Sequence, residues 1–471
     1  MNPERKRFLV VLALAWAVYL AGTHPRVFAA GNDASRWAQI ESLVDYRSAS
    51  IERSRFRLTV DRVRAGGREY SNKPPLLAFA GAALYAPLAA ATGWRLGDPA
   101  TAPAAIWVLT GLLVGLPGAA TVALFDRALG RRRSAGPRTR AVLTLALGGG
   151  TLLLSFGGTL NNHVPAAFLL FVAVLAALAG RPGASGLACG LAGAVDLLPG
   201  FGFAPFLAAA LASPDSGRAR RLLRYAAGLA AGGALLLAAN WATTGSPLPP
   251  KLLPGAVDLS AAAGPSAAGV VLPQSPRYAL EVLFGGHGLF TVSPVLALGA
   301  LGLAFAARRG TPPERRAWSA IGLGVVAQVA GHALLAGSYG GWSYGFRYLL
   351  PVAPVMMLAA PAALGGRAGR GGRALLAAAL PPSLLFAALG AYHPWPPAFE
   401  QATLVDPVAA RVRNPIGGNA AAWAAVHCPG SALAEELARR FVAGDEGARR
   451  GYFALFFASK GDLATCRRFL P

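Results

Sequence analysis

Apolar runs long enough to cross a lipid bilayer recur along the whole sequence, and they limit what the chain can fold into. Of the 471 residues, 54% are hydrophobic and only 14% are charged, whereas a soluble domain carries about a quarter charged residues. Inside a bilayer the backbone N–H and C=O groups must be paired within the spanning structure, which favours helices. The sequence therefore predicts an all-α, multi-pass membrane protein.

Short basic loops between the apolar runs explain the strong positive charge of the chain. The 44 Lys and Arg residues against 21 Asp and Glu residues give a formal net charge of +23. In a soluble protein this balance would suggest nucleic-acid binding, but here the basic residues are not gathered on one polar domain. Basic loops mark the cytoplasmic side of a membrane protein. Six clusters do so, at residues 5–7, 127–140, 181, 218–224, 308–316 and 367–373.

The positions of these clusters predict about eleven transmembrane helices. An even number of crossings must separate the first two clusters, yet three apolar runs lie between them, at residues 8–28, 76–92 and 101–125. The run 76–92 is short and contains Pro87, so we expect it to lie at the outer face or to re-enter from it. The other expected spans are 141–157, 164–180, 185–197, 199–213, 222–241, 286–307, 317–337, 347–364 and 373–391.

Two polar regions are expected outside the membrane. Residues 29–100 form a large first loop of the membrane domain, which covers residues 1–391, and residues 392–471 form a small helical C-terminal segment. The first apolar run is longer than the core of a signal peptide, so we interpret it as an uncleaved span. Cys428 and Cys466 lie in the C-terminal segment, where an extracytoplasmic location would permit a disulfide.

The first loop keeps an excess of basic residues although it is expected on the outer face. Residues 31–75 contain nine basic and six acidic residues, against the positive-inside trend. An outer loop that keeps its arginines indicates an anionic ligand. Polar residues near the membrane interior are costly and are functional candidates for that reason. In this chain they gather on the predicted outer half.

A carboxylate beside Lys and Arg at the bilayer rim fits a lipid-phosphate-linked sugar donor. The cations stabilise the leaving phosphate, whose negative charge grows in the transition state. The carboxylate accepts the proton of the attacking acceptor hydroxyl. The sequence contains no Walker loop, dinucleotide fingerprint or zinc-protease motif, so it indicates no cofactor. A need for a divalent metal stays open.

Two short motifs resemble the GT-C superfamily of membrane glycosyltransferases, which use lipid-linked donors. The stretch DASRWAQI, residues 33–40, is similar to the segment after the first span of bacterial aminoarabinose transferases and of protein O-mannosyltransferase relatives. NKPPLL, residues 72–77, stands where that family has E-K-P-P-L-L before a juxtamembrane helix. TLNNHVPAA, residues 159–167, and GGWSYGFRYLLP, residues 340–351, resemble recurring segments of bacterial members.

The resemblance implies roles for particular residues. It implies that Asp33 is the general base, that Arg36 lies beside it and that Lys73 contacts the donor phosphate. The family's second acid is Ala34 here, and Asn72 replaces the Glu before Lys73. To these we add Asp61 as a second candidate base, Arg347 as a phosphate contact, and Tyr70, Asn162, His163, Trp342 and Tyr344 as substrate-binding candidates.

Structural explanations stay open for the same residues. Asp33 could cap a helix, and Lys73 could be a snorkelling membrane anchor. Asp61 could pair with Arg62 or Arg64 on a solvated face. The aromatic cluster at 339–348 is also typical of an interfacial belt, and the remaining polar residues could be turn or capping residues: Asn161, Asn162, His163 and His287.

The sequence thus predicts an inverting glycosyltransferase with a GT-C-like bundle in a bacterial inner membrane. It would transfer a sugar from a polyprenyl-phosphate donor to an extracytoplasmic glycan, lipid or protein of the cell envelope. The alternative is a transporter or a flippase for lipid-linked sugars, which would need a polar path across the whole bilayer and a cytoplasmic-side site. A non-catalytic structural membrane protein is a third interpretation.

Overall fold

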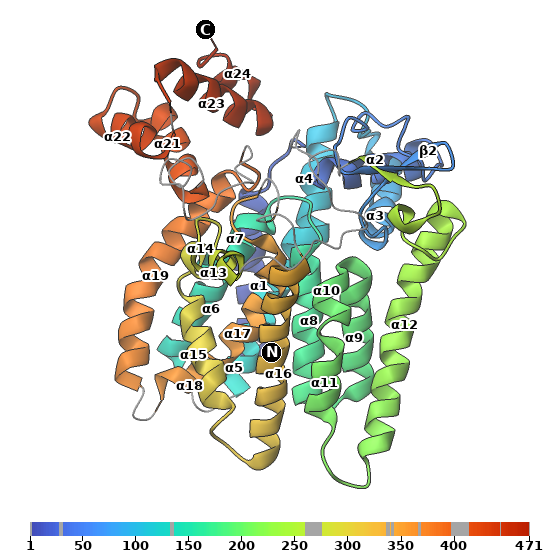
Figure 1. Cartoon of the computed structure of the whole chain (residues 1–471), viewed down its shortest axis with the longest axis vertical. Helices are drawn as coiled ribbons and strands as arrows, with labels where there is room; N and C mark the ends of the chain where they lie inside the picture. The colour runs from blue at the N-terminus through green and yellow to red at the C-terminus, as the bar shows by residue number, and fades with distance from the viewer. Residues whose placement is uncertain are drawn as a thin grey trace.

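A computed structural model of the chain shows a helical bundle with two additions at one end (Figure 1). The additions are a small domain with the only strands of the described ranges, and a group of C-terminal helices. The structure describes residues 2–27, 32–131, 136–259, 276–335, 340, 343–365, 369–396, 414–442 and 444–470.

The bundle is built from helices that run along its long axis and from shorter helices between them. Its first half contains α1 (Pro3–Ala21), α4 (Ala102–Thr110), η1 (Gly111–Gly115), α5 (Leu116–Arg131), α6 (Pro137–Gly149), α7 (Leu152–Gly157), α8 (His163–Leu178), α9 (Pro182–Val195), α10 (Leu197–Phe201), α11 (Ala204–Leu211) and α12 (Arg218–Thr244). Its second half contains α13 (Pro276–Phe284), α14 (Leu289–Val292), α15 (Leu296–Ala306), α16 (Pro312–Leu335), η5 (Arg347–Val352), α17 (Ala353–Ala359), α18 (Pro361–Leu364) and α19 (Gly369–Tyr392).

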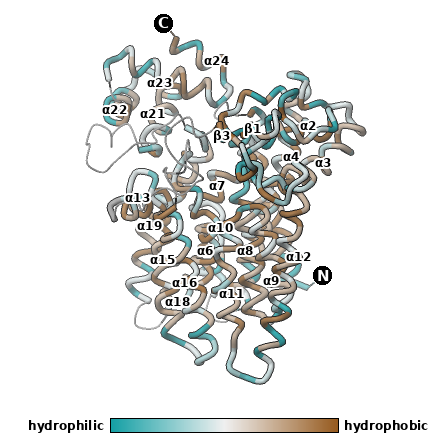
Figure 2. The backbone as a smooth tube through the Cα atoms, turned by 45° about the vertical axis from the view of Figure 1, so that its right-hand side comes forward, coloured by the Kyte–Doolittle hydropathy of each residue, from teal (hydrophilic) through white to brown (hydrophobic). Residues whose placement is uncertain are grey.

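Several of these helices meet the length and hydropathy expected of a membrane span, so the predicted all-α multi-pass fold is confirmed. Figure 2 shows apolar residues along most of the bundle. Within the described residues five segments qualify, or six if a pair of helices bent by 103° counts as one span. The exact number of crossings, eleven, stays a prediction. The five are Ala102–Arg131, Arg218–Thr244, Pro312–Leu335, Arg347–Leu364 and Gly369–Tyr392, and the bent pair is Tyr278–Val292 with Leu296–Ala306.

Small residues let the central helices approach closely, as is common in membranes. Helices α9 and α12 approach each other especially closely. A Cβ atom on Gly186 of α9 would lie 2.0 Å from the carbonyl oxygen of Tyr225 on α12. Gly190, one turn further along α9, would meet the carbonyl oxygen of Leu229 at 2.4 Å. No residue larger than glycine fits at these two positions without separating the helices.

A buried ion network places the first two basic clusters at the same end of the bundle. The carboxylate of Asp126, on α5, is fully buried and binds Arg140 at 2.6 Å and Arg7 at 2.8 Å. Arg140 also binds Glu4 at 2.9 Å. The segment between α15 and α16 and the starts of α12 and α19 lie at the same end of the bundle in Figure 1, and each carries arginines: Arg308 and Arg309 after α15, Arg218 and Arg220 in α12, and Arg370 and Arg373 in α19. We call this the arginine-rich end.

The opposite end carries the first loop, and we call it the loop end. It contains α2 (Asn32–Asp45), β1 (Arg62–Ala65), β2 (Arg68–Ser71), α3 (Leu76–Thr92), η2 (Pro250–Leu252) and β3 (Val257–Asp258) (Figure 1). The apolar run 76–92 is α3, which packs against α2 and lies at the loop end. The need for an even number of crossings between the first two basic clusters had predicted that this run does not cross the membrane.

An antiparallel sheet in the order β2-β1-β3 shapes the first loop. The turn between β1 and β2 is Gly66-Gly67, with φ of 56° and 77°, and two left-handed residues are what a tight hairpin requires. Val63 pairs with Tyr70 on one side and with Asp258 on the other. The sequence analysis missed this hairpin.

The C-terminal residues form a separate apolar core against the loop end. The helices are α21 (Pro415–His427), α22 (Ala432–Phe441), α23 (Glu446–Ser459) and α24 (Leu463–Cys466). Arg26 donates to the carbonyl oxygen of Gly461 at 2.6 Å, and Asn419 donates to that of Leu389 at 2.7 Å. Cys428 and Cys466 are both free, so the permitted disulfide is not formed, and Cys466 is packed into the apolar core.

The buried ion network gives a stability prediction. Asp126→Asn removes the charge that both Arg7 and Arg140 bind, and breaking a buried pair costs about 3–5 kcal/mol. We expect a clearly lower midpoint of thermal unfolding in detergent. Asp215→Asn is the control, because that carboxylate is half-exposed beside Arg221 and its loss should leave the midpoint unchanged. Equal midpoints for both variants would contradict the network.

Candidate functional site

Helix α2 brings two of the predicted site residues to the loop end, one turn apart. Asp33 and Arg36 are 2% and 1% exposed. Asp33 Oδ1 accepts the backbone N–H of Ala34 at 2.9 Å, so this carboxylate does help to begin the helix. A helix-capping contact of this kind is compatible with a chemical role for the carboxylate.

Arg36 ties the first loop to the membrane bundle. Its guanidinium donates to Oδ1 of Asn162, at the start of α8, at 2.6 Å, and to the carbonyl oxygen of Asn32 at 2.8 Å. Asn161 caps α8 by accepting the N–H of Val164, whereas the Asn162 side chain is turned to Arg36. Burial lowers the pKa of Arg36 to about 10, so it stays charged at neutral pH.

The hairpin brings Asp61 and Lys73 close together, because Asp61 directly precedes β1 and Lys73 follows β2. Arg62 pairs with Ser71, and Lys73 Nζ lies 2.9 Å from Oδ1 of Asp61. The hairpin also docks on α2, where Ser35 Oγ donates to the Asp61 carbonyl oxygen at 2.5 Å. Lys73 is therefore an ion-pair partner rather than a free membrane anchor.

Asp61 does not pair with the neighbouring arginines. Arg62 and Arg64 both bind Glu69 instead, each at 2.7 Å. Burial raises the pKa of Asp61, but the charges of Lys73, Arg347 and Arg36 outweigh burial and hold this pKa below its ordinary value. Burial lowers the pKa of Lys73, and Asp61 compensates only in part because two arginines lie nearby.

Arg347 is a buried cation without a carboxylate partner among the described residues. It begins η5, is 5% exposed and lies over the rings of Trp395, at 4.7 Å, and Tyr348, at 5.3 Å. Its Nε has no hydrogen-bond partner. Trp395 is fixed in turn, since its Nε1 donates to Thr159 Oγ1 at 2.8 Å. Arg347 acts electrostatically on Asp61, Lys73 and Arg36, which places it in the same cluster.

His163 and Asp196 complete the cluster from the bundle side. His163 Nδ1 lies 2.7 Å from Oδ2 of Asp196, at the break between α9 and α10. The ring of His163 packs edge-on against Tyr348 at 5.6 Å. The cluster thus joins residues from α2, the hairpin, α8, the α9–α10 break and η5: Asp33, Arg36, Asp61, Lys73, Asn162, His163, Asp196 and Arg347.

Two further substrate-binding candidates, Tyr70 and Tyr344, are not part of these contacts. Tyr70 packs with Val63 and Ala65 on the sheet. Tyr344 is fully buried, and its hydroxyl donates to the carbonyl oxygen of Phe386 at 2.6 Å. Trp342 lies outside the described residues. The roles of all three stay predictions.

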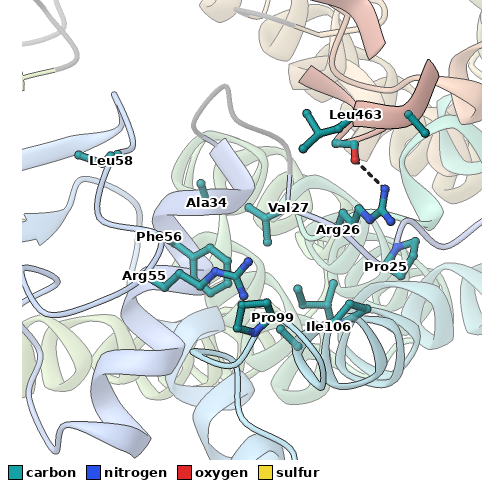
Figure 3. A pocket seen from close by; sticks show the side chains of 14 residues that line it. Pro25, Arg26, Val27, Ala34, Arg55, Phe56, Leu58, Pro99, Ile106 and Leu463 are labelled. Atoms are coloured by element: carbon teal, nitrogen blue, oxygen red, sulfur yellow. Dashed lines mark hydrogen bonds between the residues drawn. The ribbon is translucent and has the colours of Figure 1, made fainter. Parts of the chain in front are cut away.

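A cavity of about 640 Å³ lies beside the cluster rather than within it. Figure 3 shows Arg55, Phe56 and Pro99 of the first loop, Ile106 of α4 and Leu463 of α24 around it. The lining is mainly apolar. Ala34 also lines the cavity, and it follows Asp33 directly in the first turn of α2. The cavity and the cation cluster therefore meet at the start of α2.

The Asp61–Lys73 pair predicts how stability depends on pH. Lys73→Met should lower the free energy of unfolding at neutral pH, because it leaves Asp61 without its nearest cation. The folded pKa of Asp61 is lowered, so the stabilisation is complete above the unfolded pKa of about 3.9 and is lost as pH falls through the folded value. The difference between variant and parent should narrow below about pH 4.

Lys251→Met is the control for this measurement, since Lys251 is exposed on η2. It should unfold like the parent protein at every pH. A penalty for Lys73→Met that is as large at pH 3 as at pH 7 would show that Asp61 is not its partner. Chemical unfolding in detergent, followed by tryptophan fluorescence, measures both variants.

Comparisons with known proteins give structural likenesses at low sequence identity. No protein-family model and no curated protein matches the chain. Among solved structures, the chain is similar to apo ArnT from Cupriavidus metallidurans, with 17% identity over 98% of this chain and 76% of that one and a TM-score of 0.48. The same protein bound to undecaprenyl phosphate gives 17% identity, coverage of 98% and 77%, and a TM-score of 0.47.

An oligosaccharyltransferase from Archaeoglobus fulgidus gives a weaker likeness. It is 13% identical over 91% of this chain, with a TM-score of 0.46, and the chain spans 59% of that enzyme's length.

Proposed function

We propose that the chain is a membrane glycosyltransferase that takes a sugar from a polyprenyl-phosphate donor at its loop end. One observation carries the proposal: the buried guanidinium of Arg347 pairs with no carboxylate of the described chain, and Arg36 and Lys73 lie beside it. An unpaired buried charge is costly. An anionic phosphate would supply the missing partner.

The geometry of Arg347 suits a phosphate. Its face is covered by Trp395 and Tyr348, so the N–H groups at the edge of the plane are left for a ligand. Arginine binds phosphate through two parallel N–H bonds, which a lysine cannot reproduce. Arg36 is fixed at one side by Asn162 but keeps a buried Nε without a partner. Lys73 is held by Asp61 and adds a third positive charge.

These cations assist the departure of the phosphate. As the bond between the sugar's anomeric carbon and the phosphate oxygen breaks, negative charge grows on the phosphate, and fixed cations stabilise it more in the transition state than in the bound donor. The acceptor hydroxyl attacks from the opposite face of the sugar, which inverts the configuration at that carbon. The transfer needs one base to take the hydroxyl proton.

Asp33 is the better candidate for that base. The lowered pKa of Asp61 makes it a weak proton acceptor, and its ion pair gives it the task of positioning Lys73. Asp33 is within electrostatic range of Arg36, and its neighbour in the chain, Ala34, lines the cavity. An acceptor bound in the cavity would meet α2 at its first turn, where Asp33 is. We propose an extracytoplasmic glycan, lipid or protein of the cell envelope as this acceptor.

The orientation follows from the distribution of charge. The arginine-rich end would face the cytoplasm of a bacterial inner membrane, and the loop end would face outward. The first loop is basic in spite of this position. It contributes two cations, Arg36 and Lys73, and two carboxylates, Asp33 and Asp61, to the cluster, so its excess basic residues lie outside the cluster.

The phosphate role of Arg347 is tested with sugar transfer from labelled polyprenyl-phosphate sugars in membranes. Arg347→Gln should lower kcat/KM by about 10² to 10³-fold, because one fixed donor to the developing charge is lost. Arg95→Gln is the control, since Arg95 pairs with Asp45 on the exposed side of the first loop and should keep full activity. Equal activity of both variants would contradict the proposed phosphate site. Movement of the labelled lipid across the membrane without transfer would favour a flippase.

The assignment of the base is tested separately. Asp33→Asn should lower kcat by about 10² to 10⁴-fold, because the hydroxyl proton loses its acceptor. Asp61→Asn should have a smaller effect and should mainly raise KM for the donor, because it releases Lys73 from its position. If Asp61→Asn loses more kcat than Asp33→Asn at equal expression, the base is Asp61.

A further inference from the structure

A histidine beside the three cations has a buried nitrogen without a partner. His163, the first residue of α8, is 3% exposed. Its Nδ1 lies 2.7 Å from the Asp196 carboxylate, and because an ionised carboxylate only accepts, Nδ1 carries a proton. The opposite nitrogen, Nε2, is buried and makes no hydrogen bond in the described structure. Buried polar atoms are rarely left in this state.

His163 shares its neighbours with both arginines. The preceding residue, Asn162, accepts the Arg36 guanidinium. Tyr348, whose ring lies 5.6 Å from that of His163, is also the ring over which Arg347 lies. His163 is within electrostatic range of both guanidinium groups. An anion held by the two arginines would therefore lie next to the imidazole.

We propose that His163, oriented by Asp196, is a further catalytic residue whose Nε2 donates a proton to the leaving phosphate. This rests on the proposed function. As the bond between the anomeric carbon and the phosphate oxygen breaks, the electron pair goes to that oxygen, which takes the proton from Nε2. The acceptor hydroxyl gives its proton to Asp33 as it bonds to the carbon. His163 is left neutral and regains a proton from solvent. Asp33 releases the proton that it accepted to solvent, so no net proton is gained or lost by the protein.

Binding of the donor prepares the imidazole for this step. Before binding, burial disfavours a positive charge on His163, Asp196 favours it, and Arg347 of η5 and Arg36 of α2 oppose it further. A bound phosphodiester brings one negative charge next to the arginines and the imidazole, so the balance shifts to the imidazolium. The other titratable groups around the ring are Tyr348 of η5 and His332 of α16, with Asp61 and Lys73 farther along the cluster. Binding of a phosphodiester should thus take up a proton.

The test uses a polyprenyl methyl phosphodiester, whose phosphate does not titrate near neutral pH. It is titrated calorimetrically into the full chain in nanodiscs, in two buffers of different ionisation enthalpy. We expect uptake of close to one proton at about pH 7, and binding that weakens by up to about tenfold per pH unit above it. His163→Gln should abolish both effects, and Asp196→Asn should reduce them.

His332→Gln is the matched control. His332 is a second buried histidine that stacks on Tyr348 at 5.4 Å; it lies within electrostatic range of Asp196 but, among the described residues, forms no ion pair with that carboxylate, which binds His163. It should keep the proton uptake of the parent protein. Dimethyl phosphate has the same head group without the chain and should bind more than about 10²-fold more weakly, because each buried CH₂ contributes about 0.8 kcal/mol.

The outcomes separate the two proposals. If the phosphodiester binds, loses affinity in Arg347→Gln and takes up no proton, or keeps its uptake in His163→Gln, the role of His163 is overturned and the proposed function stands. The proposed function fails as well under any of three results. The phosphodiester does not bind the parent protein, it binds the Arg347→Gln variant as tightly as the parent, or dimethyl phosphate binds the parent as tightly as the polyprenyl phosphodiester does.

Discussion

The docking of the β1–β2 hairpin on α2 is the interaction on which the site depends. Ser35 holds the hairpin through the Asp61 carbonyl oxygen and through Ser71 Oγ at 2.7 Å, and Arg36, one residue further, holds α2 to α8 through Asn162. A single turn of helix therefore fixes the first loop to the bundle. Without it, Lys73 and Asp61 would have no defined position relative to Arg347.

The second constraint is electrostatic. Arg36 and Arg347 are both nearly fully buried, and Lys73 is mostly buried. Burying charge is costly unless each charge is compensated. Lys73 is compensated by Asp61, and Arg36 is compensated by oxygens of Asn32 and Asn162. Among the described residues, the guanidinium of Arg347 has only the rings of Trp395 and Tyr348. Two of the three cations are therefore compensated within the protein, and the charge of Arg347 favours the binding of an anion.

Much of the architecture could be predicted from residue patterns, and the part that could not depends on distant contacts. Apolar runs predicted the helices, and counting crossings predicted that α3 lies at the loop end. The stretch from Asp33 to Arg36 was recognisable as a helix start. Gly66-Gly67 between alternating residues was a readable hairpin signal that was missed. Nothing in the sequence indicates that Arg36 meets a residue 126 positions away, or that Trp395 covers Arg347. Tyr344 looked like an interfacial aromatic and is instead fully buried.

The central claim is that the loop end contains a site for a lipid-linked phosphate, and a structure of the chain with bound polyprenyl phosphate tests it most directly. The account predicts phosphate oxygens within about 2.7–3.2 Å of the Arg347 guanidinium, with Arg36 and Lys73 on its other sides. A phosphate bound at the arginine-rich end, beside residues 218–224 or 308–316, with Arg347 still uncovered, would contradict it.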